Sequence, residues 1–145
     1  MGSVDFNDQM ARSLCLGTNS VVVNSSYRLA PEHQFPAAVD DASAAVRWAF
    51  ENVAELGGDV RRIGVAGISA GANLAAVAAL DAADAGLDLA VQVLIVPTLD
   101  AGREYPSKSE NGEGFGLTAN ELEFSNEIYC PTSRGLDRDP RRSPM

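Results

Sequence analysis

The stretch Arg62-Ile63-Gly64-Val65-Ala66-Gly67-Ile68-Ser69-Ala70-Gly71 decides how this chain of 145 residues is expected to fold. Residues 62–66 are short and apolar on both faces, which predicts a buried parallel strand. Residues 70–85 are rich in alanine on every side, which predicts a closely packed helix that stops at Gly86. The pattern Gly-x-Ser-x-Gly stands between the two, and a turn from strand to helix is the setting in which that pattern forms a nucleophile elbow.

Ser69 is the candidate nucleophile of this turn. The turn is tight, so Gly67 and Gly71 are expected to be required there, and they leave the Ser69 hydroxyl exposed at the carboxyl end of the sheet. The backbone N–H of Ala70 opens the helix and is the candidate oxyanion donor, assisted by the helix dipole. Composition alone produces the pattern in roughly one such chain in ten. A glycine-rich turn that only packs a helix on a strand is therefore the competing interpretation.

The rest of the chain alternates helices and strands in the same way. Helices are predicted over residues 5–16, 36–56 and 118–129, and strands over residues 20–25 and 91–96. Gly17 is expected to stop the first helix and Pro36 to open the second. Thr118 and Glu121 have the spacing of a capping box. Strand-helix-strand-helix-strand predicts a parallel α/β sheet flanked by helices.

The composition describes an acidic globular protein. The formal net charge is −9, with 46% hydrophobic and 21% charged residues, which argues against nucleic acid as a partner. No stretch reaches the ~18 apolar residues of a membrane span, and the first residues do not have the pattern of a signal peptide. Cys15 and Cys130 have no metal-ligand spacing, so we expect two reduced thiols, a cytoplasmic location, no metal and no cofactor.

Three segments resemble the hormone-sensitive-lipase group of α/β-hydrolases. Residues 27–38, Tyr-Arg-Leu-Ala-Pro-Glu-His-Gln-Phe-Pro-Ala-Ala, are followed by two aspartates and resemble a loop signature of that group. Residues 67–75, Gly-Ile-Ser-Ala-Gly-Ala-Asn-Leu-Ala, resemble its elbow, and residues 139–144, Asp-Pro-Arg-Arg-Ser-Pro, resemble a segment before the strand that carries the catalytic acid. The resemblance implies a carboxylesterase- or lipase-like enzyme that hydrolyses small acyl esters through an acyl-enzyme on Ser69.

The sequence departs from the group at two positions of the elbow. Ile68 stands where the group has an acidic residue, and Ala72 replaces a glycine. His33 is the single histidine of the chain and precedes Ser69, whereas these folds place the acid and then the histidine after the serine. His33 is therefore expected to be structural, and Asp100 to be a turn aspartate.

The resemblance covers an internal portion of the group's domain. Its His-Gly-Gly-Gly oxyanion segment, its catalytic acid and its histidine have no counterpart in these residues. We therefore expect a truncated form, inactive alone. The strand that should separate residues 20–25 from residues 62–66 is also missing, which leaves open sheet edges and favours self-association or a complementing chain.

Residues 1–145 are thus expected to form a single partial α/β-hydrolase domain, with a core at 18–99, a segment at 100–130 that can form a pocket wall, and an irregular tail at 131–145. Four apolar residues of the middle segment either line that pocket or pack as the core of a small helix: Phe115, Leu117, Leu122 and Phe124. The alternative function is a non-catalytic module or pseudoenzyme that binds a partner chain or a small ester. A nucleotide-binding domain is disfavoured, because the glycines have neither the P-loop lysine nor the dinucleotide-binding spacing.

Overall fold

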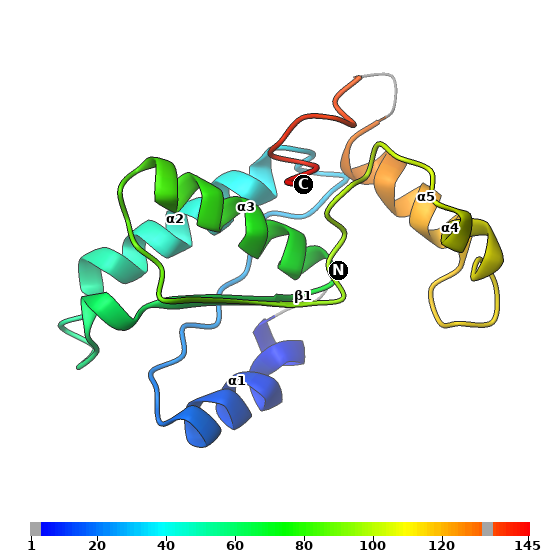
Figure 1. Ribbon diagram of the computed structural model, residues 1–145. Coiled ribbons are helices and arrows are strands. Elements are labelled where there is room, and N and C mark those ends of the chain that lie inside the picture. Colours follow the sequence, from blue (N-terminus) through cyan, green and yellow to red (C-terminus); the bar gives the residue numbers. More distant parts are fainter. Residues whose placement is uncertain (1–3, 132–134) are drawn as a thin grey trace.

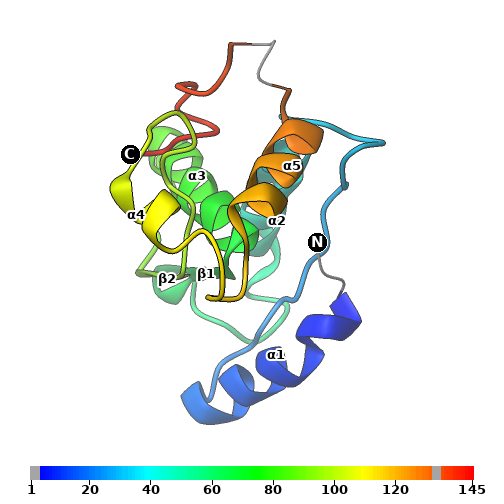
Figure 2. The ribbon, with the colours of Figure 1, turned by 90° about the vertical axis from the view of Figure 1, so that its right-hand side faces the viewer.

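The computed structural model describes residues 4–131 and 135–145, and its centre is a two-stranded parallel sheet with helices on either side (Figure 1). Strand β1 (Gly64–Ile68) pairs with β2 (Val91–Ile95), with Gly64 opposite Val91 and Ile68 opposite Ile95. Helix α3 (Ala70–Asp84) packs on both strands, and α2 (Ala37–Asn52) packs against α3. Helix α1 (Val4–Thr18) lies on the other side of the sheet (Figures 1 and 2). The expected parallel α/β architecture is confirmed as a partial fold.

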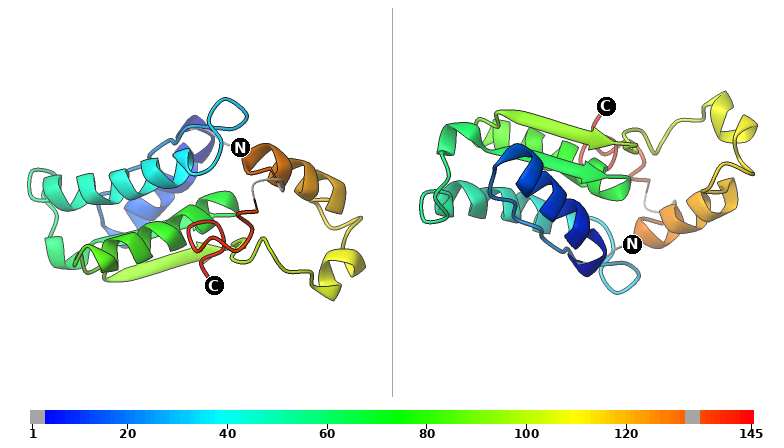
Figure 3. Two further views of the ribbon diagram at one scale, coloured as in Figure 1. Left: turned by 90° about the horizontal axis from the view of Figure 1, so that it is seen from above. Right: turned by 90° about the horizontal axis from the view of Figure 1, so that it is seen from below.

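Helices α4 (Pro106–Glu110) and α5 (Ala119–Tyr129) form an arm at one end of the molecule (Figure 3). The predicted capping box is present, because the Thr118 hydroxyl accepts from the Glu121 N–H at 3.2 Å and the Glu121 carboxylate accepts from the Thr118 N–H at 2.9 Å. The short α4 was not expected, and a 3-10 turn (Val60–Arg62) precedes β1. None of the helices formed by residues 4–131 and 135–145 is both long and apolar enough to cross a membrane.

The predicted helix ends are partly right. Gly86 has a positive φ of 73° directly after the C-cap of α3, as expected of a stop residue. Helix α2 ends at Asn52 rather than at residue 56, so Gly57, with a φ of 78°, belongs to the turn beyond the helix. Helix α1 passes Gly17 and ends at Thr18, and Asn19 takes the positive φ of 50° instead. Pro36 is the residue before α2 rather than its first residue.

The strand predicted over residues 20–25 is absent. Its β-branched residues predicted extended structure, but a strand also needs a hydrogen-bonded neighbour. In the described part of the chain this segment makes only local or side-chain bonds. The Ser20 N–H donates to the Cys15 oxygen at 3.2 Å, the Ser20 and Thr18 hydroxyls bond at 2.6 Å, and Asn24 Nδ2 donates to the Val4 oxygen at 2.9 Å.

The strand predicted over residues 62–66 lies at 64–68 instead, and Arg62 belongs to the 3-10 turn before it. The prediction that this strand is buried on both faces is wrong, because its residues alternate between exposed and partly exposed and its packed layer lies mainly on the α3 side.

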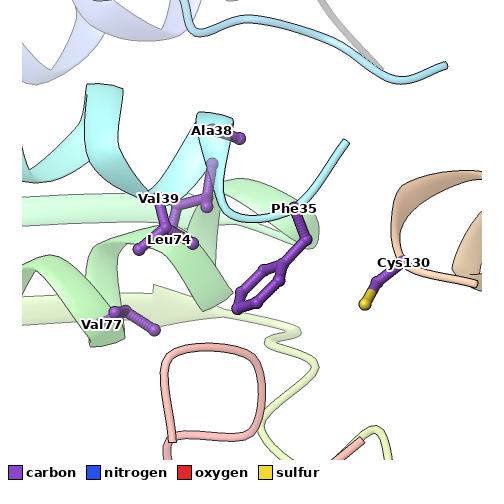
Figure 4. Packing of buried hydrophobic residues seen from close by; sticks show 6 residues of the cluster. All are labelled: Phe35, Ala38, Val39, Leu74, Val77 and Cys130. Atoms are coloured by element: carbon purple, nitrogen blue, oxygen red, sulfur yellow. The ribbon is translucent and has the colours of Figure 1, made fainter. Parts of the chain in front are cut away.

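The hydrophobic core lies on the side of the sheet where α2 and α3 are found. Figure 4 shows side chains of α2, α3 and the preceding loop meeting near the end of α5. The buried cluster consists of Phe35, Ala38, Val39, Leu74, Val77 and Cys130. The rings of Phe35 and Tyr129 meet edge to face with centroids 5.9 Å apart, an arrangement that aromatic pairs favour. The core therefore supports α3 from the side opposite to the strands.

Candidate active site

Ser69 forms the turn that joins β1 to α3. Its backbone has φ 53° and ψ −120°, a region that costs free energy for a residue with a side chain. The Ser69 N–H donates to the Ile95 oxygen at 2.9 Å and so continues the ladder between the strands. The Ser69 oxygen accepts from the N–H groups of Ala72 and Asn73 at 3.0 and 3.2 Å. The strained backbone of the elbow is thus held by the sheet on one side and by the helix on the other.

Gly67 is required by this turn, because a Cβ at that position would stand 2.1 Å from the Gly71 oxygen and 2.6 Å from the Ala72 nitrogen. Both neighbours are backbone atoms that cannot move without opening the first turn of α3. Gly71 has nothing within 4 Å of its Cβ position, so the expectation that both glycines are sterically necessary is right for Gly67 and wrong for Gly71.

The Ser69 side chain is exposed and does not cap α3. Among the residues that the structure describes, no hydrogen bond involves the Ser69 Oγ or the Ala70 N–H. The first N–H groups of a helix have no partner within the helix and carry its positive dipole end. This arrangement is chemically suited to an attacking hydroxyl beside a donor for an oxyanion.

His33 and Asp100 are titratable residues that lie outside the Ser69 turn. His33 is exposed in the loop before α2, and its backbone N–H donates to the Leu29 oxygen at 2.9 Å. Asp100 accepts from the Gly102 N–H at 3.1 Å and from the Tyr105 hydroxyl at 2.8 Å, and the second bond raises the pKa of Tyr105. Both carboxylate oxygens of Asp100 therefore accept hydrogen bonds within its own turn, and Asp100 is a turn aspartate as expected. Within the described ranges, no hydrogen bond links either residue to Ser69.

Asn73, in the first turn of α3, helps to hold the Ser69 turn, and the sequence did not predict this role. Its Nδ2 donates to the Thr98 oxygen at 2.6 Å and to the Arg142 oxygen at 2.9 Å. Asn73 is 8% exposed and Arg142 is 4% exposed. Asn73 is the single polar residue of the stretch 70–80. A buried amide needs such partners, and that was the available signal. The described tail residues 135–145 are therefore anchored to the first turn of α3 through Arg142.

Two adjacent aspartates of α2 tie the loop signature and the tail to the same helix. Arg28 forms a fork on Asp41, with Nη2 to Oδ1 at 2.8 Å, and its N–H donates to Asp41 Oδ2 at 2.8 Å. These bonds from Arg28 lower the pKa of Asp41. Arg141 donates to Asp40 at 2.5 Å across 101 residues of sequence. The two pairs hold both segments of the family resemblance against α2.

Three of the four apolar residues predicted to line a pocket or to pack as a small core are exposed. Phe115, Leu117 and Phe124 are 74%, 50% and 67% exposed, and only Leu122 is half-buried. The interpretation of all four as the core of a small helix is therefore wrong for three of them. Ile68, beside Ser69, is also exposed.

Comparison with known proteins gives a consistent picture. The family described as "alpha/beta hydrolase fold" matches residues 1–145. Carboxylesterase NlhH of Mycobacterium tuberculosis is 45% identical over 138 residues, which cover 94% of this chain and 42% of that protein. The ethyl acetate hydrolase of Pseudomonas putida is 39% identical over 149 residues, covering 100% of this chain and 46% of that protein. The crystal structure of the thermostable carboxylesterase EstE1, cloned from a metagenomic library, superposes with a TM-score of 0.94 at 38% identity, covering 100% of this chain and 50% of that one. The chain spans less than half the length of the two curated relatives.

Proposed function

The chain belongs to the α/β-hydrolase fold family, and from that premise we propose that it carries the nucleophile portion of a serine carboxylic-ester hydrolase. Ser69 is the nucleophile, and the Ala70 N–H is one oxyanion donor. The observation that carries this proposal is the strained turn at Ser69, which joins a strand to a helix and presents an exposed hydroxyl. A glycine turn that served packing alone would not require a serine in this backbone conformation.

The proposed reaction has two steps. The Ser69 Oγ bonds to the ester carbonyl carbon and loses its proton to a base, and the bond to the alcohol breaks as the alcohol takes that proton. Water then attacks the acyl-enzyme, releases the carboxylic acid and restores the Ser69 hydroxyl. Within the described residues no hydrogen bond links His33 to Ser69, and both carboxylate oxygens of Asp100 are bonded within its own turn. We therefore propose that the base and its orienting acid come from outside these 145 residues.

The proposed substrates are small acyl esters. Two relatives support this class by their names, a carboxylesterase and an ethyl acetate hydrolase. The proposed compartment is the cytoplasm, supported by Cys15 and Cys130 being free thiols.

The test measures hydrolysis of p-nitrophenyl acetate and butyrate by the longest reading frame that contains this sequence. Ser69→Ala should lower kcat by at least ~10³-fold. Ser26→Ala, another exposed serine, is the matched control and should leave kcat unchanged. Full activity in the Ser69→Ala protein would refute the assignment. The 145-residue chain alone should stay within a few-fold of the buffer rate, and turnover that depends on Ser69 would disprove the need for an external base.

A second candidate function, a non-catalytic module that binds a partner chain or a second copy, is favoured by the open side of the sheet. Val91, Val93 and Ile95 of β2 are 55%, 45% and 45% exposed, and exposed apolar strands invite pairing with another chain. Sedimentation velocity at increasing concentration tests it. Concentration-dependent association that Val93→Lys abolishes would support this function, and a monomer at all concentrations would exclude self-association.

A further inference from the structure

We propose that Asn73 is a positioning residue that holds the nucleophile turn in its strained shape. The inference rests on the proposed function, because it takes Ser69 to be the nucleophile. Asn73 does not touch the reacting atoms in this scheme. It acts through the backbone on which Ser69 and the Ala70 N–H are carried.

The side-chain amide of Asn73 joins three separate segments of the chain. It stands in the first turn of α3, and its two Nδ2 hydrogens reach the Thr98 oxygen at 2.6 Å and the Arg142 oxygen at 2.9 Å. Both acceptors are backbone carbonyls, so only a side chain with two donors on one atom can satisfy them together. Aspartate has the same shape but offers two acceptors, and leucine offers neither donor. The contact is buried, since Asn73 is 8% exposed, which makes unpaired carbonyls there costly.

The bonds of the Asn73 side chain to Thr98 and Arg142, called the clamp below, lie close in sequence to two strained residues. Ser69 has φ 53°, and Val96, directly after β2, has φ 46°, which is unusual for a β-branched residue. Thr98 is two residues beyond Val96, and the Asn73 N–H donates to the Ser69 oxygen at 3.2 Å. Asn73 therefore holds the chain shortly after each strained residue, in α3 after Ser69 and at Thr98 after Val96. Such conformations persist only where surrounding contacts enforce them. Asn73 supplies a backbone bond to Ser69 itself and a side-chain bond to Thr98, two residues after Val96.

The tail segment around Arg142 is itself held in place by side-chain bonds. The Arg142 oxygen accepts from Asn73, and the Arg142 guanidinium, which is 4% exposed, pairs with Asp137. The Ser143 hydroxyl donates to the Asp137 oxygen at 2.6 Å and accepts from the Ala101 N–H at 3.0 Å. The acceptor for Asn73 is thus held in a fixed place by its own bonds, and the elbow is tied to a rigid support.

Amide hydrogen exchange on the 145-residue chain tests the clamp directly. Asn73→Asp should accelerate exchange of the Ser69 amide, which bonds to Ile95, by tenfold or more, while the Val77 amide in the middle of α3 changes less than twofold. The matched control is Asn24→Asp, which removes an exposed bond to the Val4 oxygen and should leave both rates unchanged. Equal acceleration at Ser69 and Val77 would indicate general destabilisation and overturn the proposal, as would an unchanged Ser69 rate.

A second arm separates this inference from the proposed function. In the longest reading frame, a fluorophosphonate ester should label Ser69 in the wild-type protein, detected by peptide mass spectrometry. Asn73→Asp should label at least tenfold more slowly, and Asn24→Asp at the wild-type rate. Wild-type speed in Asn73→Asp would overturn the positioning role. Failure of the wild-type protein to label would refute Ser69 as nucleophile, while the exchange rates would still decide whether Asn73 holds the turn.

Discussion

Valines of the helical layer and valines of the sheet have the same side chain and opposite surroundings. Val39 of α2 and Val77 of α3 are 0% and 1% exposed, whereas Val91 and Val93 of β2 are 55% and 45% exposed. The helices bury their apolar faces against each other (Figure 4), but the strands have a packed layer mainly on the α3 side (Figure 1). Apolar character tells which residues gain from burial, and the presence of a partner layer decides which of them are buried.

The nucleophile turn lies at the boundary between these two regions. The Ser69 N–H belongs to the sheet through its bond to Ile95, and the Ser69 oxygen belongs to the first turn of α3. The buried helical layer of α2 and α3 therefore supports the elbow through α3 and Asn73. The sheet, whose other face is exposed, supports it through a single strand pair. These two are called the closed side and the open side below. Substitutions on the two sides should have very different costs.

The largest effect is expected from Gly67→Ala. The new Cβ would stand 2.1 Å from the Gly71 oxygen, so the junction between sheet and helix would open, with a loss of about 4 kcal/mol or more in the free energy of unfolding. Thermal unfolding followed by circular dichroism measures this loss. The matched control is Gly71→Ala, which meets nothing within 4 Å in the first turn of α3 and should be neutral or stabilising by up to ~1 kcal/mol. Equal melting temperatures for the two variants would disprove the steric account of the elbow.

A pair of valine truncations tests the contrast between the two regions. Val77→Ala removes buried methyl groups and should cost about 2 kcal/mol, or ~6 °C in melting temperature. Val93→Ala removes the same groups from an exposed position and should stay within ~0.5 kcal/mol. Comparable losses would show that the open side of β2 is covered in solution, which would favour the chain-binding alternative.

The elbow itself was predictable from its own residues. Gly67, Ser69 and the alanine-rich stretch after them form a local pattern, and the structure has the predicted order of strand, turn and helix, with the strand two residues later than expected. Residues 20–25 failed as a strand because extended propensity does not supply a hydrogen-bonded neighbour. The Asn73–Arg142 bond spans 69 residues, so no local periodicity announces it. Helix α4 was missed because its residues after Pro106 are polar and show no apolar period.

A smaller effect is expected at the capping box of α5, which lies on the arm outside both layers. Thr118→Ala removes the hydroxyl that accepts from Glu121 and should cost about 1 kcal/mol. Because the arm is peripheral, amide exchange should speed up within α5 and remain unchanged at Val77. Faster exchange at Val77 would show that α5 and the core unfold as one unit.

The smallest effect concerns the pH dependence of the Arg28–Asp41 pair on the closed side. Bonds from Arg28 lower the pKa of Asp41 below its unfolded value, so the carboxylate contributes stability above the unfolded pKa of about 3.9, and that contribution is lost as pH falls through the folded pKa. Both side chains are partly exposed, at 50% and 26%, so Asp41→Asn should cost only ~0.2–1 kcal/mol at pH 7, or about 1–3 °C.

Melting curves of wild type and Asp41→Asn from pH 7 down to pH 2.5 measure this contribution. The gap between them should be constant down to about pH 5 and should close in more acidic solution, because the wild-type carboxylate then becomes as neutral as the amide. Arg28→Gln should show the same closing gap, since the guanidinium is the source of the lowered pKa. A gap that persists unchanged at the lowest pH would mean that the shape of the side chain, and not its charge, anchors the loop to α2.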